Sequence, residues 1–219
     1  MGFWDKVGEI ATIVVFVIFS PILVPIALIA VWLEGKENII ALDGKSMSGK
    51  DTLINILSGK GFTKKHKATP DNQMLKMEIK YGNTEFAVTE FHNVSGADKA
   101  NNQKAELRKK IFSDEYSNKN IYFIYLFDAK LYRDNPKEKK DIQADIKAFL
   151  KQINSINSKP AREKKINFKV LGTRGDEFTK KDKENIENQI RELGVECEIF
   201  DMTKTKTEHL MPFIIGEQK

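Results

Sequence analysis

Residues 44–52 read GKSMSGKDT, and the spacing of their glycines restricts the fold more than any other feature of the chain. This stretch follows a short apolar run, NIIALD, and precedes apolar residues at helical spacing, which are Leu53, Ile54, Ile56 and Leu57. The pattern G-x-x-x-x-G-K between a strand and a helix predicts a loop whose backbone N–H groups surround phosphate oxygens. The helix N-terminus contributes its positive dipole end, and Lys50 is expected to reach the outer phosphates.

Strand and helix patterns alternate through the rest of the chain. The segments 74–81 and 84–91 alternate apolar and polar residues around a Gly-Asn turn and predict a β-hairpin. Buried strands are expected at 38–43, 120–128, 167–173 and 196–200, and helices at 103–116, 137–156, 181–193 and 207–215. This order predicts an α/β fold with a mostly parallel six-stranded sheet, one antiparallel edge strand and helices on both faces.

An apolar segment from Ile10 to Leu33 precedes this pattern and contains no charged residue in 24 positions. As a helix it would extend about 36 Å, enough to cross a hydrocarbon core of about 30 Å. It is therefore predicted to be an N-terminal transmembrane helix that contacts the lipid bilayer through residues 10–33. Pro21 and Pro25 leave two forms open, a single kinked span and a shallow hairpin.

We therefore divide the chain into a membrane segment, 1–34, and a nucleotide-binding domain, 35–219. The net charge is +5, which permits an anionic neighbour such as a lipid surface or nucleic acid. The lysines are spread through loops and helices without exposed aromatic residues between them, so nucleic acid is not the expected partner. Cys197 is the single cysteine of the sequence, which excludes an intramolecular disulfide.

The tetrapeptide TRGD at 173–176 follows a predicted strand and resembles the guanine-reading motif N/T-K-x-D. With the glycine-bounded loop, it makes residues 38–216 resemble small P-loop GTPases, the Ras-like G domains. The resemblance implies that Asp176 accepts hydrogen bonds from the N1–H and the exocyclic amine of guanine, and that Arg174 lies over the base. The implied nucleotide-binding residues are Gly44, Lys45, Ser46, Met47, Ser48, Gly49, Lys50, Asp51, Thr52, Thr173, Arg174 and Asp176.

Two further stretches occupy positions that such GTPases use for the γ-phosphate. NVSG at 93–96 lies where the family has D-x-x-G, so Gly96 is implied, with Lys50, as a catalytic residue that contacts the γ-phosphate. Thr69, with Thr63 as the other candidate, corresponds to the threonine that closes on Mg²⁺. Ala97 stands where many members have a water-orienting glutamine, which implies slow hydrolysis.

The sequence departs from the family at two Mg²⁺ positions. Asp51 replaces the Ser or Thr ligand of the loop, and Asn93 replaces the aspartate of D-x-x-G. Mg²⁺ is often held by one or two carboxylates together with phosphates and water. One hypothesis is that the carboxylate has moved to Asp51, which would bind the metal with Asn93 and Thr69. The alternative is loss of the metal site.

These features predict a membrane-anchored protein that binds GTP or GDP with Mg²⁺ and acts as a slow GTPase or a GTP-regulated switch. Its expected partner is an unidentified protein or a second copy of the chain, with the nucleotide domain on the cytoplasmic side. Two other functions stay open, a nucleotide-monophosphate kinase and a pseudo-GTPase that recruits partners without hydrolysis. Five scattered arginines argue against the kinase, which needs an arginine-rich lid and acceptor site.

Overall fold

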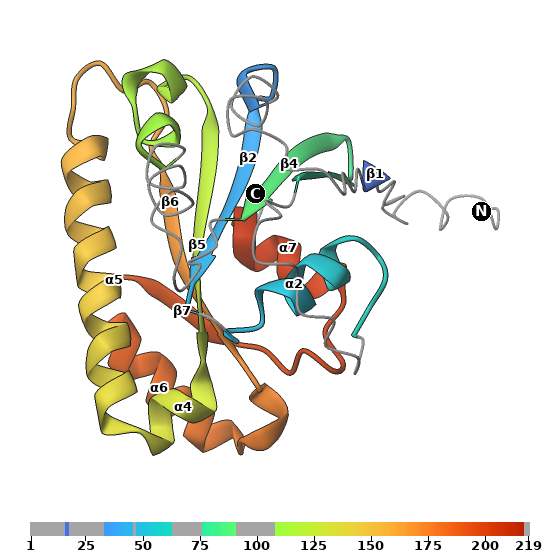
Figure 1. The fold of residues 1–219 in the computed structure, drawn as a ribbon, viewed down its shortest axis with the longest axis vertical. Helices are drawn as coiled ribbons and strands as arrows, with labels where there is room; N and C mark the ends of the chain where they lie inside the picture. Colours follow the sequence, from blue (N-terminus) through green and yellow to red (C-terminus); the bar gives the residue numbers. More distant parts are fainter. Residues whose placement is uncertain (1–15, 18–32, 46, 63–75, 91–107, 217–219) are drawn as a thin grey trace, which may run out of the picture.

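The computed structural model describes residues 16–17, 33–45, 47–62, 76–90 and 108–216. Its centre is a twisted sheet with the strand order β1-β3-β4-β2-β5-β6-β7 (Figure 1). The strands are β1 (Phe16–Val17), β2 (Asn38–Gly44), β3 (Lys76–Tyr81), β4 (Thr84–Glu90), β5 (Asn120–Asp128), β6 (Asn167–Thr173) and β7 (Glu196–Ile199). β2 pairs in parallel with both β4 and β5, so its C-terminal end lies in the middle of the sheet.

The six predicted strands are confirmed, and β3 pairs antiparallel with β4 as expected for the hairpin. The edge differs from the prediction. β1 pairs antiparallel with β3, so β3 has a neighbour on both sides and Phe16–Val17 form the outer strand. These two residues had been predicted to be helical, and the strand replaces that assignment. Residues 10–15 and 18–32 of the predicted membrane segment lie outside the described residues.

Helices cover both faces of the sheet, with α5 and α6 on one side and α2 and α7 on the other (Figure 1). The helices are α2 (Lys50–Leu57), α4 (Ala129–Asp134), α5 (Pro136–Asn157), α6 (Lys180–Arg191) and α7 (Thr207–Ile215). α5 begins where Asn135 accepts hydrogen bonds from the N–H groups of Lys137 and Glu138. Of the helix predicted at 103–116, residues 108–111 are helical and Asp114–Tyr116 form a 3-10 turn, and residues 103–107 lie outside the described part.

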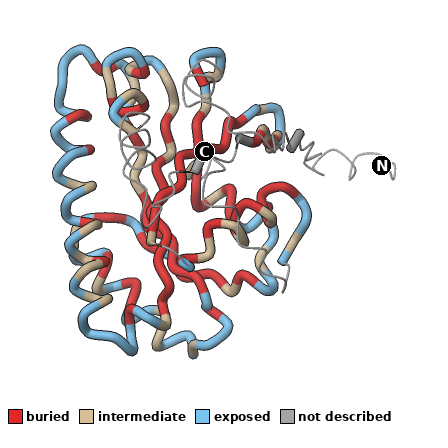
Figure 2. The backbone as a smooth tube through the Cα atoms, in the orientation of Figure 1, coloured by how far each residue is buried: buried red, intermediate tan, exposed pale blue. Residues whose placement is uncertain are grey.

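The core forms two layers because successive residues of β2 point to opposite faces. Ile40 and Leu42 pack with α2 and α7, whereas Ile39 and Ala41 pack on the other face with Phe112 and Phe123. Buried backbone is concentrated along the sheet (Figure 2). The alternation puts Asp43, the next odd-numbered residue, on the α5 side at the end of the strand.

Leu33 and Glu34 pack onto the domain at the end of the sheet where β2 starts. Leu33 is buried with Ile111 and Phe112. The Glu34 carboxylate lies 2.5 Å from Lys110 Nζ, and its carbonyl oxygen accepts from Lys119 Nζ at 2.6 Å. Within the described parts of the chain, we find no helix with the length and apolar character that a membrane span requires.

Candidate nucleotide-binding site

The loop between β2 and α2 has a backbone that only glycine can adopt at its two ends. Gly44 has φ +144°, and a Cβ atom there would lie 2.3 Å from the Leu126 carbonyl oxygen. Gly49 has φ +90°, and a Cβ atom there would lie 2.7 Å from Thr173 Cγ2. Gly49 is also the N-cap of α2 and has no capping side chain. The first N–H groups of α2 therefore have no side-chain acceptor at their cap and can donate hydrogen bonds to an anion.

Lys50 lies inside this loop. Its side chain is buried, and its Nζ atom donates to the carbonyl oxygens of Gly44 at 2.8 Å and Lys45 at 2.7 Å. It also lies 3.3 Å from Ser48 Oγ. The ammonium group is thus held at the centre of the loop, where a point charge can meet phosphate oxygens.

Lys45, in contrast, turns its side chain away from the loop. Its Nζ atom pairs with Glu138 at 2.9 Å and Asp141 at 3.2 Å, both on α5. Desolvation lowers the pKa of Lys45, but the hydrogen bonds and charges of these two carboxylates outweigh it and raise the pKa above its ordinary value. Lys45 therefore takes part in the predicted site through its backbone, while its side chain fixes the loop to α5.

A pocket of ≈ 160 Å³ adjoins the loop and brings the TRGD segment beside it. Thr173 joins the two, because its hydroxyl donates to the carbonyl oxygens of Ser48 at 3.2 Å and Phe127 at 3.3 Å. A Cβ atom on Gly175 would lie 2.6 Å from the Phe200 carbonyl carbon, so this turn packs directly on the segment after β7. The residues that line the pocket are Met47, Gly49, Thr52, Phe62, Thr173, Arg174, Asp176, Glu177, Met202 and Thr203.

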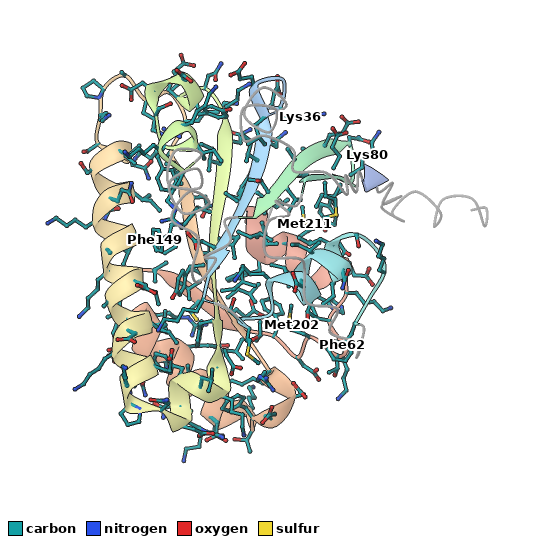
Figure 3. The ribbon with its side chains drawn as sticks, in the orientation of Figure 1. Lys36, Phe62, Lys80, Phe149, Met202 and Met211 are labelled. Carbon is teal, nitrogen blue, oxygen red and sulfur yellow. The ribbon has the colours of Figure 1, made fainter. Side chains whose placement is uncertain are left out.

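Two of these lining residues, Phe62 and Glu177, were not considered from the sequence. Met202 and Thr203 lie where the G-domain family has its S-A-K loop, to which they have little identity. Phe62 is a half-exposed aromatic ring at the end of the segment that follows α2, and Met202 follows β7. Figure 3 shows Phe62 and Met202 on the same side of the molecule, below α2. Phe62 and the predicted Met47, which is 71% exposed, are exposed apolar side chains that a flat ligand could cover. This exposure is visible only in the structure, so the sequence carried no signal for Phe62.

Arg174 has a left-handed backbone, with φ 60°. Its Nε atom donates to Asp128 Oδ2 at 2.6 Å, and its Nη1 atom donates to Glu177 Oε1 at 3.2 Å. Asp176 follows in the 3-10 turn Gly175–Glu177 and lines the same pocket. The structure therefore brings Thr173, Arg174 and Asp176 together with the glycine-bounded loop.

The predicted metal ligands are only partly described. Asp51 lies in the first turn of α2, next to Lys50. Its oxygen donors suit Mg²⁺, and its place beside the loop suits a metal that also contacts phosphate. Ser46, Thr69, Asn93 and Gly96 lie outside the described residues, and the described ones contain no group of three or more metal-ligating side chains. Thr52 instead lines the pocket.

An ion pair between a buried aspartate and a partly exposed arginine lies beneath the loop, and no pattern in the sequence indicated it. The guanidinium of Arg108 contacts the carboxylate of Asp43, which also accepts a hydrogen bond from the Gly44 N–H at 2.7 Å. Burial raises the pKa of Asp43 to about 6, although Arg108, the Gly44 N–H and Lys50 all oppose that change. The guanidinium carbon of Arg108 lies 5.3 Å from the ring centroid of Phe149 on α5.

Comparison with solved structures identifies the fold. A probable GTP-binding protein engB superposes with a TM-score of 0.53 and 18% identity, over 81% of this chain and 96% of that one. A single-residue variant of Era from Aquifex aeolicus, bound to GDP and AlF4⁻, gives a TM-score of 0.55 and 16% identity, over 82% of this chain and 56% of that one. This chain thus spans little more than half the length of Era. At these identities the likeness establishes the α/β fold of P-loop GTP-binding domains. No protein-family model and no curated protein sequence matches the chain.

Proposed function

We propose that this protein is a membrane-anchored GTP-binding switch with slow intrinsic GTP hydrolysis. The observation that carries this proposal is the pocket shared by the glycine-bounded loop, residues 44–50, and the TRGD segment. A nucleotide whose phosphates lie on the loop would extend its base into that pocket, where Asp176 can accept two hydrogen bonds. Guanine offers the N1–H and the 2-amino group as donors, whereas adenine has no donor at either position.

Lys50 and the N–H groups of the loop would bind the β- and γ-phosphates. Asp51 is the described residue that would hold Mg²⁺, with Asn93 and Thr69 as its proposed companions. The chemistry that Mg²⁺ supplies in such sites is neutralisation of charge on the phosphate oxygens. Hydrolysis would transfer the γ-phosphoryl group to water and give GDP and phosphate. With Ala97 in the place of a water-orienting glutamine, this step is expected to be slow, with Gly96 contacting the γ-phosphate.

The positions of the arginines favour this function over nucleotide-monophosphate kinase activity. The chain has five arginines, and all of them are described. Arg108, Arg133 and Arg191 pair with Asp43, Asp134 and Glu187, and Arg162 is buried against backbone carbonyl oxygens. Only Arg174 among them lines the pocket. A kinase lid needs several arginines that converge on the transferred phosphate, and this arrangement does not supply them.

The proposed membrane anchor is the apolar segment 10–32 apart from the two residues of β1, which pair with β3, because Leu33 is buried in the domain. The nucleotide domain would lie on the cytoplasmic side, where GTP is present. Leu33 and Glu34 pack at the start of β2, the end of the sheet opposite the loop, so the nucleotide would face away from the bilayer. The proposed partner is a protein that recognises the GTP-bound form, or a second copy of the chain. Membrane fractionation of the full chain and of a deletion of 10–32, which removes β1 as well but keeps the buried Leu33, tests the anchor.

Nucleotide binding is tested with the full chain in detergent, using mant-GTP and mant-ATP, each with Mg²⁺ and with EDTA. Tight Mg²⁺-dependent binding of mant-GTP alone supports the proposal. Preference for mant-ATP would overturn the guanine assignment and favour the kinase. Binding of mant-GTP with no phosphate release in a single-turnover assay would favour a pseudo-GTPase, and absence of binding to either nucleotide would overturn both enzyme assignments.

A further inference from the structure

We propose that Asp128 is a positioning residue for the nucleotide base. This inference rests on the proposed binding of a guanine nucleotide and adds a residue to it. Together with Glu177, Asp128 holds the guanidinium of Arg174 in one orientation at the wall of the base pocket. Asp128 lies at the end of β5 and does not line the pocket itself, so it would act through Arg174.

The side chain of Arg174 is 44% exposed but is fixed at two of its nitrogen atoms. Its Nε–H donates to Asp128 Oδ2 at 2.6 Å, and its Nη1 donates to Glu177 Oε1 at 3.2 Å. Two contacts on different nitrogens determine the plane of the guanidinium as well as its position. A planar guanidinium can stack on an aromatic base, and one that is ordered before binding loses less side-chain entropy when the base arrives.

Both oxygens of Asp128 are engaged, which prevents the carboxylate from turning away. Oδ1 accepts from the N–H groups of Lys130 at 2.9 Å and Leu131 at 3.0 Å, and thereby caps α4. Oδ2 accepts from Arg174, and the Asp128 side chain is only 6% exposed. A charge-assisted hydrogen bond to a buried carboxylate is stronger than one between neutral groups.

The start of α4 closes these contacts into a ring. Lys130 Nζ pairs with Glu177 Oε2 at 2.9 Å, so Glu177 bridges Arg174 and Lys130, and Asp128 bonds both the Lys130 backbone and the Arg174 side chain. The ring spans the ends of two neighbouring strands, β5 and β6. A lysine at 174 has one nitrogen and could not reproduce the two separate contacts that fix the plane.

The test compares a ligand that has a base with one that has only phosphates. In Asp128→Asn, the amide oxygen can still cap α4, while the amide NH₂ then faces Arg174 in place of an acceptor. We expect the Kd of the full chain for mant-GDP to rise about tenfold. The Kd for inorganic tripolyphosphate, measured by calorimetry, is expected to stay within about twofold, because the loop is unchanged. Asp114→Asn, which removes an exposed partner of Lys159 away from the pocket, is the matched control.

Arg174→Lys is a second variant, and it should fold because the side chain is 44% exposed. We expect it, too, to raise the Kd for mant-GDP while the Kd for tripolyphosphate stays nearly unchanged. Equal mant-GDP affinity in wild type and Asp128→Asn would overturn the positioning role. A parallel loss of tripolyphosphate affinity would also overturn it, because the effect would then be structural. If the wild-type chain binds tripolyphosphate but not mant-GDP, the proposed guanine function fails and the positioning role fails with it.

Discussion

The guanidinium of Arg108 forms an ion pair with the carboxylate of Asp43 beneath the glycine-bounded loop, although the two residues are 65 positions apart in the sequence. Arg108 belongs to the helical residues 108–111 that follow the undescribed segment 91–107, whereas Asp43 directly precedes Gly44. The pair thus connects the base of the loop to the point where the described chain resumes, 12 positions after Gly96. Lys110, two residues further on, contacts Glu34, which lies just before β2, whereas Asp43 lies near the end of that strand.

Removal of Arg108 alone is expected to be costly. Arg108→Met leaves the buried Asp43 without its cation, and we expect the free energy of unfolding to fall by about 3 kcal/mol in chemical denaturation. The double variant Asp43→Asn with Arg108→Met should recover much of that loss, because no unpaired buried charge remains. Arg133→Met is the control, since its partner Asp134 is exposed, and it is expected to cost less than about 1 kcal/mol.

The pH dependence of stability tests the environment of Asp43. The folded pKa of about 6 lies above the ordinary value of 3.8, so the folded protein binds this proton more tightly than the unfolded chain. The stabilising contribution is complete below about pH 4 and is lost as the pH rises through 6. The difference between 3.8 and about 6 corresponds to about 3 kcal/mol.

Asp43→Asn removes this titration. As the pH rises from 4 to 7, wild type is therefore expected to lose stability relative to Asp43→Asn, by up to about 3 kcal/mol in urea titrations. The groups that face Asp43 are Arg108, Lys50, Asp145 and Tyr125, whose hydroxyl donates to Asp145 at 2.8 Å. The opposite trend, with wild type gaining on the variant, would mean that Arg108 outweighs burial.

Most of the fold could be predicted from sequence because its strands are short apolar runs bounded by polar residues. The strand at 167–173 has the predicted bounds, and that at 120–128 does as well. α4 was missed because it has six residues and only Ala129 and Tyr132 are buried, too few to show a helical period. β1 could not be predicted, since Phe16–Val17 lie within an unbroken apolar run that has no period of its own.

The site residues, too, could be predicted from the sequence only where the signal is local. Thr173 and Asp176 belong to one tetrapeptide whose spacing is itself the signal, so sequence could identify them. The roles of Asp43 and Asp128 depend on partners 65 and 46 positions away. A carboxylate at a strand end is common in parallel sheets, and nothing local distinguishes one that binds an arginine from one that is solvated.

Gly175 is expected to be essential for the base pocket. In Gly175→Ala the new Cβ would lie 2.6 Å from the Phe200 carbonyl carbon and 2.7 Å from the Asp201 nitrogen. The TRGD turn must then move away from the segment after β7, and we expect mant-GDP affinity to fall at least tenfold with a stability loss of about 2 kcal/mol. Gly59→Ala is the control, because its Cβ would meet no atom within 4 Å, and only its positive φ of +73° is strained. Unchanged affinity in Gly175→Ala would show that this packing does not shape the pocket.

Asp176→Asn is expected to change the preferred base. Guanine donates from N1–H and the 2-amino group, but asparagine has only one acceptor oxygen. When that oxygen accepts from N1–H, the asparagine NH₂ faces the 2-amine and leaves it without an acceptor. Xanthine carries an oxygen at the 2-position, which the asparagine NH₂ can meet. We expect GDP affinity to fall by about 100-fold or more and xanthosine diphosphate to bind more tightly than GDP, as measured by displacement of a fluorescent nucleotide. If GDP affinity does not change, Asp176 does not read the base.

The metal hypothesis makes a prediction about Asp51 that does not depend on turnover. If Asp51 supplies the carboxylate for Mg²⁺, Asp51→Ala should reduce the ratio of the mant-GDP Kd in EDTA to that in Mg²⁺ to near one. The affinity in EDTA itself should not fall, because the variant removes a negative charge from beside the phosphates. Asp51→Ser restores a neutral oxygen ligand and separates two cases. A ratio that stays near one means that the carboxylate is required, and recovery of the wild-type ratio means that a hydroxyl suffices at this position. If wild type binds equally well in Mg²⁺ and in EDTA, the carboxylate has not moved to the loop and the metal site has been lost.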